Sequence, residues 1–410
     1  MGRHIIEEAS RCLQCKRPLC TQGCPVNTPI REMIKTFLAG DIRQAGELLF
    51  QNNPLSVVCS LICPHENFCE GHCVLAKKNA PVQVSDIENY ISRYYLEQFQ
   101  PERPVKPHNA TRIAIIGSGP AGLTVAFIMA SQGFDVTLFE SEEHIGGVLR
   151  YGIPAFRLPK DLLERIREML LNLGVKIRPN MTIGPVIGLD DLFRDNYKAI
   201  FVGTGVWNPR PLRIHGETLG HVHYAINYLK NPDSYWLGKK VAVIGAGNVA
   251  MDVARTALRK GAEKVTILYR RGEEHMTATR YEYDYAKLDG VRFQFFISPV
   301  EIVEGGVHCV HTRLVPGEDG RTRVEPIEEE KEFFPADSVF IAASQAPRTN
   351  LTGMEIGRTG LVITDEEGRT SREGVFASGD VVTGAKTVAE AVSLSKRSAQ
   401  AMLEYLAGQN

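Results

Sequence analysis

The chain has 410 residues, of which 43% are hydrophobic and 23% are charged, and its formal net charge is −1 at pH 7. This length predicts about two to three domains with sizeable cores, and the composition is typical of a globular protein. The near-neutral charge argues against nucleic acid or an anionic membrane surface as a partner. No apolar h-region appears near residue 1 and no apolar run approaches about 18 residues, so we expect neither export nor a membrane span, and we expect a cytoplasmic location.

The cysteines are distributed very unevenly. Eight of the nine lie between Cys12 and Cys73, and the ninth is Cys309. In a reducing compartment such a concentration indicates metal ligation rather than disulfides. The spacing is C-x2-C-x4-C-x3-C-P from Cys12 and C-x3-C-P-x4-C-x3-C from Cys59. The Cys-Pro pairs are typical of bacterial ferredoxins, although ferredoxins have x2 where the first group has x4. Iron–sulfur clusters are favoured because a flavin-type redox domain follows directly, and eight cysteines would suffice for two 4Fe-4S clusters. Two four-thiolate zinc sites are the alternative.

Helical spacing of apolar residues lies between and after the cysteine groups. Residues 29–38 and 41–51 predict two helices, and Asp86 is expected to cap a third. We therefore predict a small helical domain over residues 1–109, whose core is largely supplied by the clusters. Its last part, residues 101–109, contains three prolines and is expected to be a stiff linker.

The next stretch carries a dinucleotide fingerprint. Residues 113–116 predict a buried parallel strand, and Gly117, Gly119 and Gly122 follow as G-x-G-x-x-G before a helix. A second strand ends on Glu140, about 20 positions on, where a carboxylate can accept hydrogen bonds from a ribose. The first glycine allows a tight turn, the second lets the backbone approach a pyrophosphate, and the third allows close helix packing. A bound dinucleotide is favoured over a plain βαβ unit.

A second fingerprint begins at Lys240. Gly245 and Gly247 occupy the first two glycine positions, and the following strand ends in Arg270 and Arg271 instead of an acid. A guanidinium pair there can bind a 2′-phosphate, so NADP(H) is favoured over NAD(H). A solvent-exposed strand end is the alternative reading of the arginines, and the acidic residues 273–274 weaken the positive field.

The two fingerprints, which begin at Gly117 and Gly245, form an internal repeat with a period of 128 residues. One unit is expected to bind FAD and the other the nicotinamide coenzyme. Near the end of the chain, residues 374–377 predict a short strand, and Gly379-Asp380 precedes a helix from about Thr387 to Leu406. This arrangement suits the ribityl and pyrophosphate part of a flavin, and a helix-capping turn is the alternative.

The flavin domain is then discontinuous. We predict its first part at 110–222, an inserted NAD(P)-binding domain at 223–341, and its second part at 342–410. The glycine- and alanine-rich segments 203–205 and 342–344 are expected to mark the two crossings.

No dithiol follows the amino-terminal cysteines. Beyond Cys73 the only cysteine is Cys309, which we expect in the core or in a strand. A disulfide reductase of the thioredoxin or glutathione kind is therefore not expected. Electrons must leave the flavin through the amino-terminal clusters or directly to a bound acceptor.

This order of features resembles the small (beta) subunit of bacterial glutamate synthase. It also resembles the NAD(P)H-oxidising part of dihydropyrimidine dehydrogenase and the large subunit of ferredoxin-NADP transhydrogenase. The resemblance is carried by EASRC at 8–12, GIPAFRLP at 152–159, GNVAMD at 247–252 and Gly379-Asp380. It implies an α/β fold in which a helical iron–sulfur domain precedes two nested, doubly wound, Rossmann-like dinucleotide-binding domains.

The resemblance also implies ligands for two 4Fe-4S clusters. The first cluster would be held by Cys12, Cys15, Cys20 and Cys73, and the second by Cys24, Cys63, Cys69 and Glu88. The dihydropyrimidine enzymes have a glutamine at the position of Glu88, and the carboxylate adds negative charge to the cluster. Cys59 would be a spare, although the sequence leaves open whether Glu88 or Cys59 completes the second cluster.

The nucleotide contacts follow from the same resemblance. It implies flavin contacts at Ser118, Gly119, Ala121, Glu140, Gly147, Val148, Arg157, Gly379, Asp380 and Thr387. It implies coenzyme contacts at Gly247, Asn248, Val249, Arg270 and Arg271. One phosphate-side arginine of the family is replaced here by Thr277.

The implied function is that of an NAD(P)H-oxidising electron-input subunit. A hydride would pass to FAD, and single electrons would pass through the clusters to a separate reductase subunit; the cofactors do this chemistry, so no catalytic side chain is required. The partner would be of the glutamate synthase large-subunit type. The alternatives are the NAD(P)H subunit of a dihydropyrimidine dehydrogenase, whose partner is a flavin-dependent pyrimidine reductase, and a non-catalytic, cluster-bearing binding module.

Overall fold

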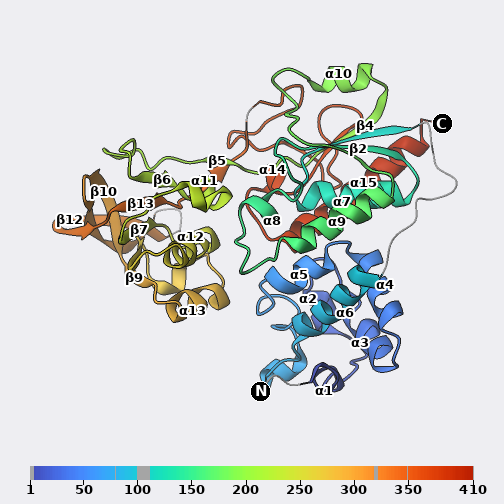
Figure 1. Cartoon of the computed structure of the whole chain (residues 1–410), viewed down its shortest axis with the longest axis horizontal. Helices are drawn as coiled ribbons and strands as arrows, with labels where there is room; N and C mark the ends of the chain where they lie inside the picture. The colour runs from blue at the N-terminus through green and yellow to red at the C-terminus, as the bar shows by residue number, and fades with distance from the viewer. Residues whose placement is uncertain (1–3, 79, 99–110, 318–321, 349, 410) are drawn as a thin grey trace. The chain divides into compact units, whose positions relative to one another are not determined.

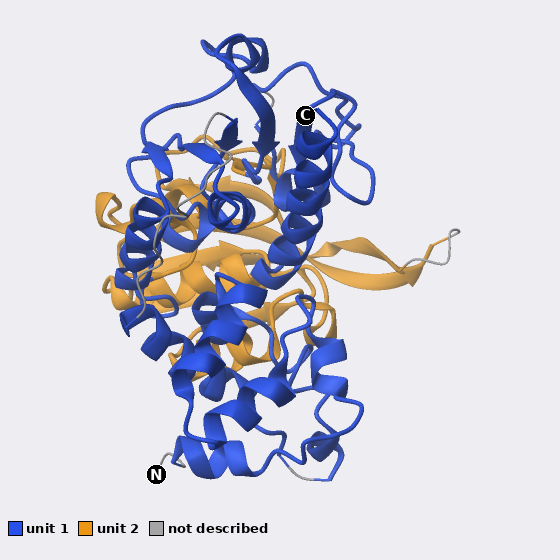
Figure 2. Ribbon diagram, turned by 90° about the vertical axis from the view of Figure 1, so that its right-hand side faces the viewer, with its two compact units in different colours: residues 1–150, 155–206, 346–410 blue, residues 151–154, 207–345 orange. Residues whose placement is uncertain are grey.

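The computed structural model describes residues 4–78, 80–98, 111–317, 322–348 and 350–409. The chain forms two compact units, shown in Figure 2: residues 1–150, 155–206 and 346–410 form unit 1, and residues 151–154 and 207–345 form unit 2. The predicted linker at 101–109 lies outside the described residues. None of the helices in the described ranges is long and apolar enough to cross a membrane.

The amino-terminal part of unit 1 is helical (Figure 1). Its elements are α1 (Ile5–Ser10), α2 (Leu19–Gly23), α3 (Ile30–Leu38), α4 (Ile42–Asn52), α5 (Ser56–Ile62), the 3-10 turn η1 (Val74–Lys77) and α6 (Val84–Gln98). The two helices predicted between the cysteine groups are confirmed, and the Asp41 side chain caps α4 by accepting from the Gln44 backbone N–H at 2.9 Å. The prediction that Asp86 caps the third helix is wrong. Because α6 begins at Val84, Asp86 lies in its first turn, where a carboxylate still faces the positive end of the helix dipole.

The cysteines are part of the core of this helical region. Ile30, Ile34, Ile87 and Ile91 are fully buried on the facing sides of α3 and α6, and Cys69 is buried among them. The apolar stripe that predicted the helices therefore faces the thiol-bearing loops.

The remainder of unit 1 is built on a parallel sheet with strand order β15-β4-β1-β2-β3. The strands are β1 (Arg112–Ile116), β2 (Asp135–Phe139), β3 (Lys176–Arg178), β4 (Tyr197–Val202) and β15 (Val375–Ala377). The helices are α7 (Pro120–Ser131), α8 (Val148–Tyr151), α9 (Asp161–Asn172), α10 (Leu189–Arg194), α14 (Asp380–Thr383) and α15 (Val388–Ala407). Helix α7 is apolar on nearly all sides because it packs against both the sheet and α15.

Unit 2 contains a second parallel sheet, with strand order β6-β13-β7-β8-β9. Its strands are β6 (Val222–Tyr224), β7 (Lys240–Ile244), β8 (Lys264–Tyr269), β9 (Arg292–Phe295) and β13 (Ser338–Ile341). Its helices are α11 (Ala225–Lys230), α12 (Asn248–Arg259) and α13 (Arg280–Leu288), with 3-10 turns η2 (Pro232–Ser234) and η3 (Glu273–His275). An antiparallel sheet follows, formed by β10 (Ile297–Val303), β11 (Gly306–Pro316) and β12 (Thr322–Pro335). The short strands β5 (Asn208–Pro209) and β14 (Gln345–Ala346) pair with each other.

The predicted internal repeat is visible in the topology. Each parallel sheet has a fingerprint strand at its centre, β1 or β7, with the next strand in sequence, β2 or β8, beside it. The chain passes between the units after Val206 and after Gln345, next to the small-residue segments expected at the crossings. The domain limits themselves stay predictions.

Candidate functional site

The three glycines of the first fingerprint have different surroundings. Gly117 has a φ of +95°, and a Cβ built on it would lie 2.6 Å from the carbonyl oxygen of Gly203. A Cβ on Gly122 would lie 1.9 Å from the carbonyl oxygen of Gly117. A Cβ on Gly119 would have no atom within 4 Å. The open space at Gly119, at the N-terminus of α7, is where a pyrophosphate can approach the backbone, so this turn fits a dinucleotide.

A polar network ties the turn to the end of β2. The Ser118 hydroxyl donates to the Glu140 carboxylate and accepts from the Gly146 backbone N–H at 3.0 Å. A Cβ on Gly147 would lie 2.7 Å from Cα of Gly119, so these two backbones are in contact. The structure thus brings together the predicted flavin contacts Ser118, Gly119, Glu140, Gly147 and Val148.

The Glu140 carboxylate is fully occupied within the protein. One oxygen accepts from the backbone N–H and hydroxyl of Ser118, and the other accepts from the Ser141 hydroxyl and the Glu142 N–H. A carboxylate has about four acceptor positions, so its observed role is to hold the glycine turn against the strand. The contact with a ribose stays a prediction.

The carboxy-terminal Gly-Asp segment lies against the fingerprint helix. Gly379 has a φ of +75°, and a Cβ on it would lie 2.9 Å from Cβ of Ala121. The predicted strand before it and the predicted final helix are confirmed as β15 and α15. The capping alternative is also realised, because Gly379 is the N-cap of α14 and Thr387 forms a capping box with Glu390. Gly379 therefore packs directly against the helix of the first fingerprint.

Two further predicted flavin contacts differ in their surroundings. Burial raises the pKa of Asp380 to about 6, even though its carboxylate accepts a hydrogen bond from the Lys386 backbone N–H at 3.2 Å. Arg157 is half-buried in the segment between α8 and α9.

The second fingerprint, in unit 2, opens in the same way. Gly245 has a φ of +125°, and a Cβ on it would lie 2.4 Å from the carbonyl oxygen of Ala342. A Cβ on Gly247 would meet only the Thr277 hydroxyl, at 3.1 Å. The Asn248 side chain accepts from the Thr279 backbone N–H at 3.0 Å. Thr277 therefore borders the turn of the second fingerprint, and Val249 is half-buried in α12.

The two arginines after β8 are not neutralised by the neighbouring acids. Arg270 is exposed, whereas Arg271 is half-buried and its Nε is a buried donor without a hydrogen-bond partner among the described residues. Glu273 accepts from Arg280 at 2.9 Å and from the Tyr283 hydroxyl at 2.6 Å, so its charge is engaged elsewhere. An unpaired buried guanidinium nitrogen fits an anionic group of a ligand.

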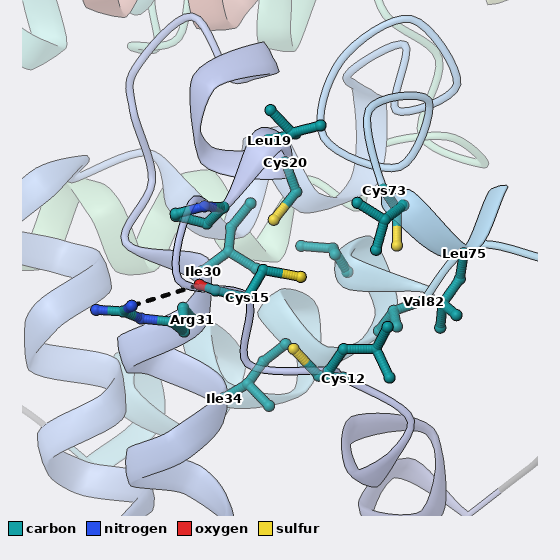
Figure 3. A pocket seen from close by; sticks show the side chains of 14 residues that line it. Cys12, Cys15, Leu19, Cys20, Ile30, Arg31, Ile34, Cys73, Leu75 and Val82 are labelled. Carbon is teal, nitrogen blue, oxygen red and sulfur yellow. Dashed lines mark hydrogen bonds between the residues drawn. The ribbon is translucent and has the colours of Figure 1, made fainter. Parts of the chain in front are cut away.

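Four cysteines line one pocket in the helical region, and Figure 3 shows their sulfurs pointing into it. We call Cys12, Cys15, Cys20 and Cys73 the first cysteine group. The pocket walls are apolar, with contributions from Ile30, Ile34, Leu75 and Val82. This group is the set that the resemblance implies for one cluster.

The thiols of the first cysteine group act on one another. Burial raises the pKa of Cys20 to about 11, and the charges of Cys12 and Cys73 add to this effect. The Gln14 side chain donates to Cys12 Sγ at 3.5 Å. Since the thiolate form is costly here without a cation, the donor set fits a metal cluster, which binds thiolates and supplies the compensating positive charge.

A second set of thiols faces Glu88, on α6. Burial is the main cause that raises the pKa of Cys24 and of Cys69, and the Glu88 carboxylate adds to both shifts. The hydrogen bond with Cys59 and burial are the main causes that raise the pKa of Cys63. The negative charges of Glu88 and Cys24 add smaller effects in the same direction. We call Cys24, Cys63, Cys69 and Glu88 the second cysteine group.

Glu88 is unusual among the carboxylates of the protein. The residue is 5% exposed and its carboxylate has no hydrogen bond or ion pair to any residue that the structure describes, and burial raises its pKa well above the usual value. Cys59, by contrast, accepts a hydrogen bond from the Asn53 side chain at 3.3 Å. No motif in the sequence marks Asn53. Within the described ranges, no three His, Cys, Asp or Glu side chains are placed to hold a single metal ion.

The ninth cysteine, Cys309, is fully buried in β11, as predicted. It lies in unit 2, outside both cysteine groups.

Comparisons with known proteins agree with this architecture. Residues 111–394 match the pyridine nucleotide-disulphide oxidoreductase family, and residues 2–99 match the family of dihydropyrimidine dehydrogenase domain II, 4Fe-4S cluster. The glutamate synthase (NADPH) small chain of Halomonas elongata is 35% identical, over 97% of this chain and 90% of its own length. The NADP(+)-dependent formate dehydrogenase subunit beta of Moorella thermoacetica is 33% identical, over 94% of this chain and 60% of its own.

Among solved structures, Mycobacterium tuberculosis FprA in complex with NADPH has a TM-score of 0.63 at 19% identity, covering 74% of this chain and 85% of FprA. This likeness supports the nested two-sheet fold. The match of residues 2–99 favours iron–sulfur clusters over zinc in the helical region. The protein is an oxidoreductase, and it belongs to the pyridine nucleotide-disulphide oxidoreductase family, in which the glutamate synthase small chains are relatives of nearly the same length.

Proposed function

We propose that this chain is an NADPH-oxidising electron-input subunit that serves a separate reductase. The observation that carries the proposal is the composition of unit 1, which contains both a dinucleotide fingerprint and two cysteine groups. Such a unit combines a site for a hydride-accepting cofactor with sites for one-electron carriers.

The first fingerprint is the proposed FAD site. FAD supplies the chemistry that converts a hydride into single electrons. The chain supplies the open backbone at Gly119, the Ser118–Glu140 network that fixes the turn, and the Gly379 segment packed on Ala121. The absence of a side chain at Gly119 leaves room for the cofactor.

The two cysteine groups are the proposed sites of two 4Fe-4S clusters. In the second cysteine group we assign the fourth ligand to Glu88 rather than Cys59. A buried carboxylate without a partner is costly, and ligation of iron removes that cost. Cys59 already has the Asn53 amide as its hydrogen-bond partner and lies beside Cys63.

The second fingerprint is the proposed NADPH site. The unpartnered Nε of Arg271 supports a contact with the 2′-phosphate that distinguishes NADPH from NADH. The names of the compared relatives support the same coenzyme, since one is an NADPH-type glutamate synthase chain and another an NADP(+)-dependent dehydrogenase subunit.

The proposed partner is a substrate-reducing subunit of the glutamate synthase large-subunit type, in the cytoplasm, where thiols stay reduced. The relatives with this architecture are named as a small chain and as a beta subunit, and such names imply a second subunit. A pyrimidine-reducing partner is the second candidate, because residues 2–99 match a domain named after dihydropyrimidine dehydrogenase.

Anaerobic titration with NADPH and NADH in parallel tests the proposal. Purified protein should contain about eight iron atoms per chain, and NADPH should bleach the flavin and cluster bands. Cys73→Ser should lose about half of the iron, whereas the matched control Cys309→Ser should keep all of it. Zinc in place of iron, or a flavin that neither coenzyme reduces, contradicts the proposed function.

A further inference from the structure

We propose that Lys396 acts as a positioning residue for the second cysteine group, where its positive charge raises the reduction potential of the bound cluster. This inference rests on the proposed function, since it requires a cluster at that group. It assigns to the last helix of the chain a role in tuning electron transfer that no fingerprint or cysteine motif includes.

Hydrogen bonds connect Lys396 with the loop that carries Cys24. Helix α15, which contains Lys396, packs against α7 and also contacts α5. The Lys396 ammonium donates to the Asn52 side-chain oxygen at 2.8 Å, and the Asn52 side-chain nitrogen donates to the carbonyl of Val26 at 3.2 Å. Val26 is two residues after Cys24. Asn52, at the end of α4, therefore holds the ammonium beside the Cys24 loop.

The charge on Lys396 is not compensated by an acid. Its side chain is half-buried, and no carboxylate lies within ion-pairing distance of it among the residues that the structure describes. Burial lowers the pKa of Lys396, and the nearby Cys24 is the group whose negative charge opposes that effect. A half-buried ammonium without an acid is unfavourable unless another anion is close. A thiolate-bound cluster at Cys24 is such an anion.

The ligand set explains why a cation is useful here. With Glu88 in place of a neutral ligand, the second cluster carries one additional negative charge, which lowers its reduction potential. The Lys396 ammonium supplies a positive charge of equal size. Because the reduced form of a bound cluster would be more negative than the oxidised form, the Lys396 ammonium would stabilise the reduced form more. Lys396 thereby offsets the effect of Glu88.

The test is an anaerobic redox titration of the full chain, monitored by electron paramagnetic resonance, after the iron content of each variant has been measured. Lys396→Met should keep the iron of the wild type and lower the potential of one of the clusters by about 59 mV, which is a tenfold change for a one-electron couple. Lys396→Arg should restore the potential. The matched control Arg397→Met removes an exposed cation from the same helix and should change neither cluster.

Three results overturn the inference: equal potentials in Lys396→Met and the wild type, an equal shift in Arg397→Met, or a shift that Lys396→Arg does not restore. If Lys396→Met binds less iron than the wild type, Lys396→Gln replaces it, because glutamine keeps a polar group that can bond to Asn52. The reduction potential of Lys396→Gln is then compared with that of the wild type in the same way. A wild-type protein without iron contradicts the proposed function itself. A wild-type protein with full iron and no effect at Lys396 contradicts only this inference.

Discussion

Replacing Gly119 by alanine should preserve the fold and weaken flavin binding, whereas the same replacement at Gly122 should damage the fold. Both glycines belong to one fingerprint, and both changes add one methyl group. The difference lies in what that methyl group meets. At Gly119 no atom lies within 4 Å, and the φ of −69° suits any residue. At Gly122 the carbonyl oxygen of Gly117 lies 1.9 Å away and cannot withdraw without opening the turn.

The magnitudes follow from these distances. An alanine in compatible backbone stabilises a protein by about 0.4–1 kcal/mol through the unfolded state, so flavin-free Gly119→Ala should unfold at or slightly above the wild-type temperature. Overpacking costs about 1–3 kcal/mol, and the backbone contact places Gly122→Ala at or above the upper end. For a unit of this size, that cost corresponds to a melting temperature lower by about 6–12 °C. In Gly119→Ala the added methyl group should crowd the pyrophosphate at a cost of about 2 kcal/mol. This cost corresponds to flavin binding that is about 30-fold weaker.

The assay combines thermal unfolding of the flavin-free proteins with FAD titration followed by flavin fluorescence. Iron content serves as the control, because neither change touches a cysteine group, and it should equal that of the wild type in Gly119→Ala. The reasoning is refuted if Gly119→Ala binds FAD with wild-type affinity, or if it loses as much stability as Gly122→Ala. Either outcome would mean that the open space at Gly119 is not the pyrophosphate site.

Three further predictions concern charged groups. Glu88→Gln should keep the iron and raise the reduction potential of one cluster by about 59 mV or more, because a negative ligand is replaced by a neutral one. An unchanged reduction potential in the redox titration would mean that Glu88 is not a ligand of the cluster. Arg271→Ala should raise the KM for NADPH by about tenfold or more and leave the KM for NADH nearly unchanged, since a charge-assisted hydrogen bond contributes about 1.5–3 kcal/mol. An equal rise for both coenzymes, or the same rise in the control Arg280→Ala, would argue against a 2′-phosphate contact. The raised pKa of Asp380, about 6, means that the unfolded chain loses this proton first as pH rises. Between pH 4 and pH 6, ionisation of Asp380 should therefore lower the free energy of unfolding of flavin-free protein by up to about 3 kcal/mol. Asp380→Asn should remove this pH dependence when unfolding by urea is measured. Parallel pH profiles for the wild type and Asp380→Asn would refute the burial argument.

The sequence by itself determined the features that depend on neighbouring residues. The glycine spacing predicts the turns at Gly117 and Gly245 because a tight strand–helix connection needs those backbone conformations. Hydrophobic periodicity predicts α3 and α4 because a helix brings every third or fourth residue to one face. The start of α6 was misplaced because capping residues such as Asp86 are also favourable inside the first turn.

The tertiary structure alone decided which distant groups meet. Cys73 joins Cys12 across the helical region, and the resemblance to a family implied this pairing, whereas spacing left it open. The isolation of the Glu88 carboxylate and the contact of Lys396 with Asn52, 344 residues away, have no local signal. Burial and electrostatics depend on everything that surrounds a group in space. A chain of amino acids specifies those surroundings only after its helices and sheets have packed.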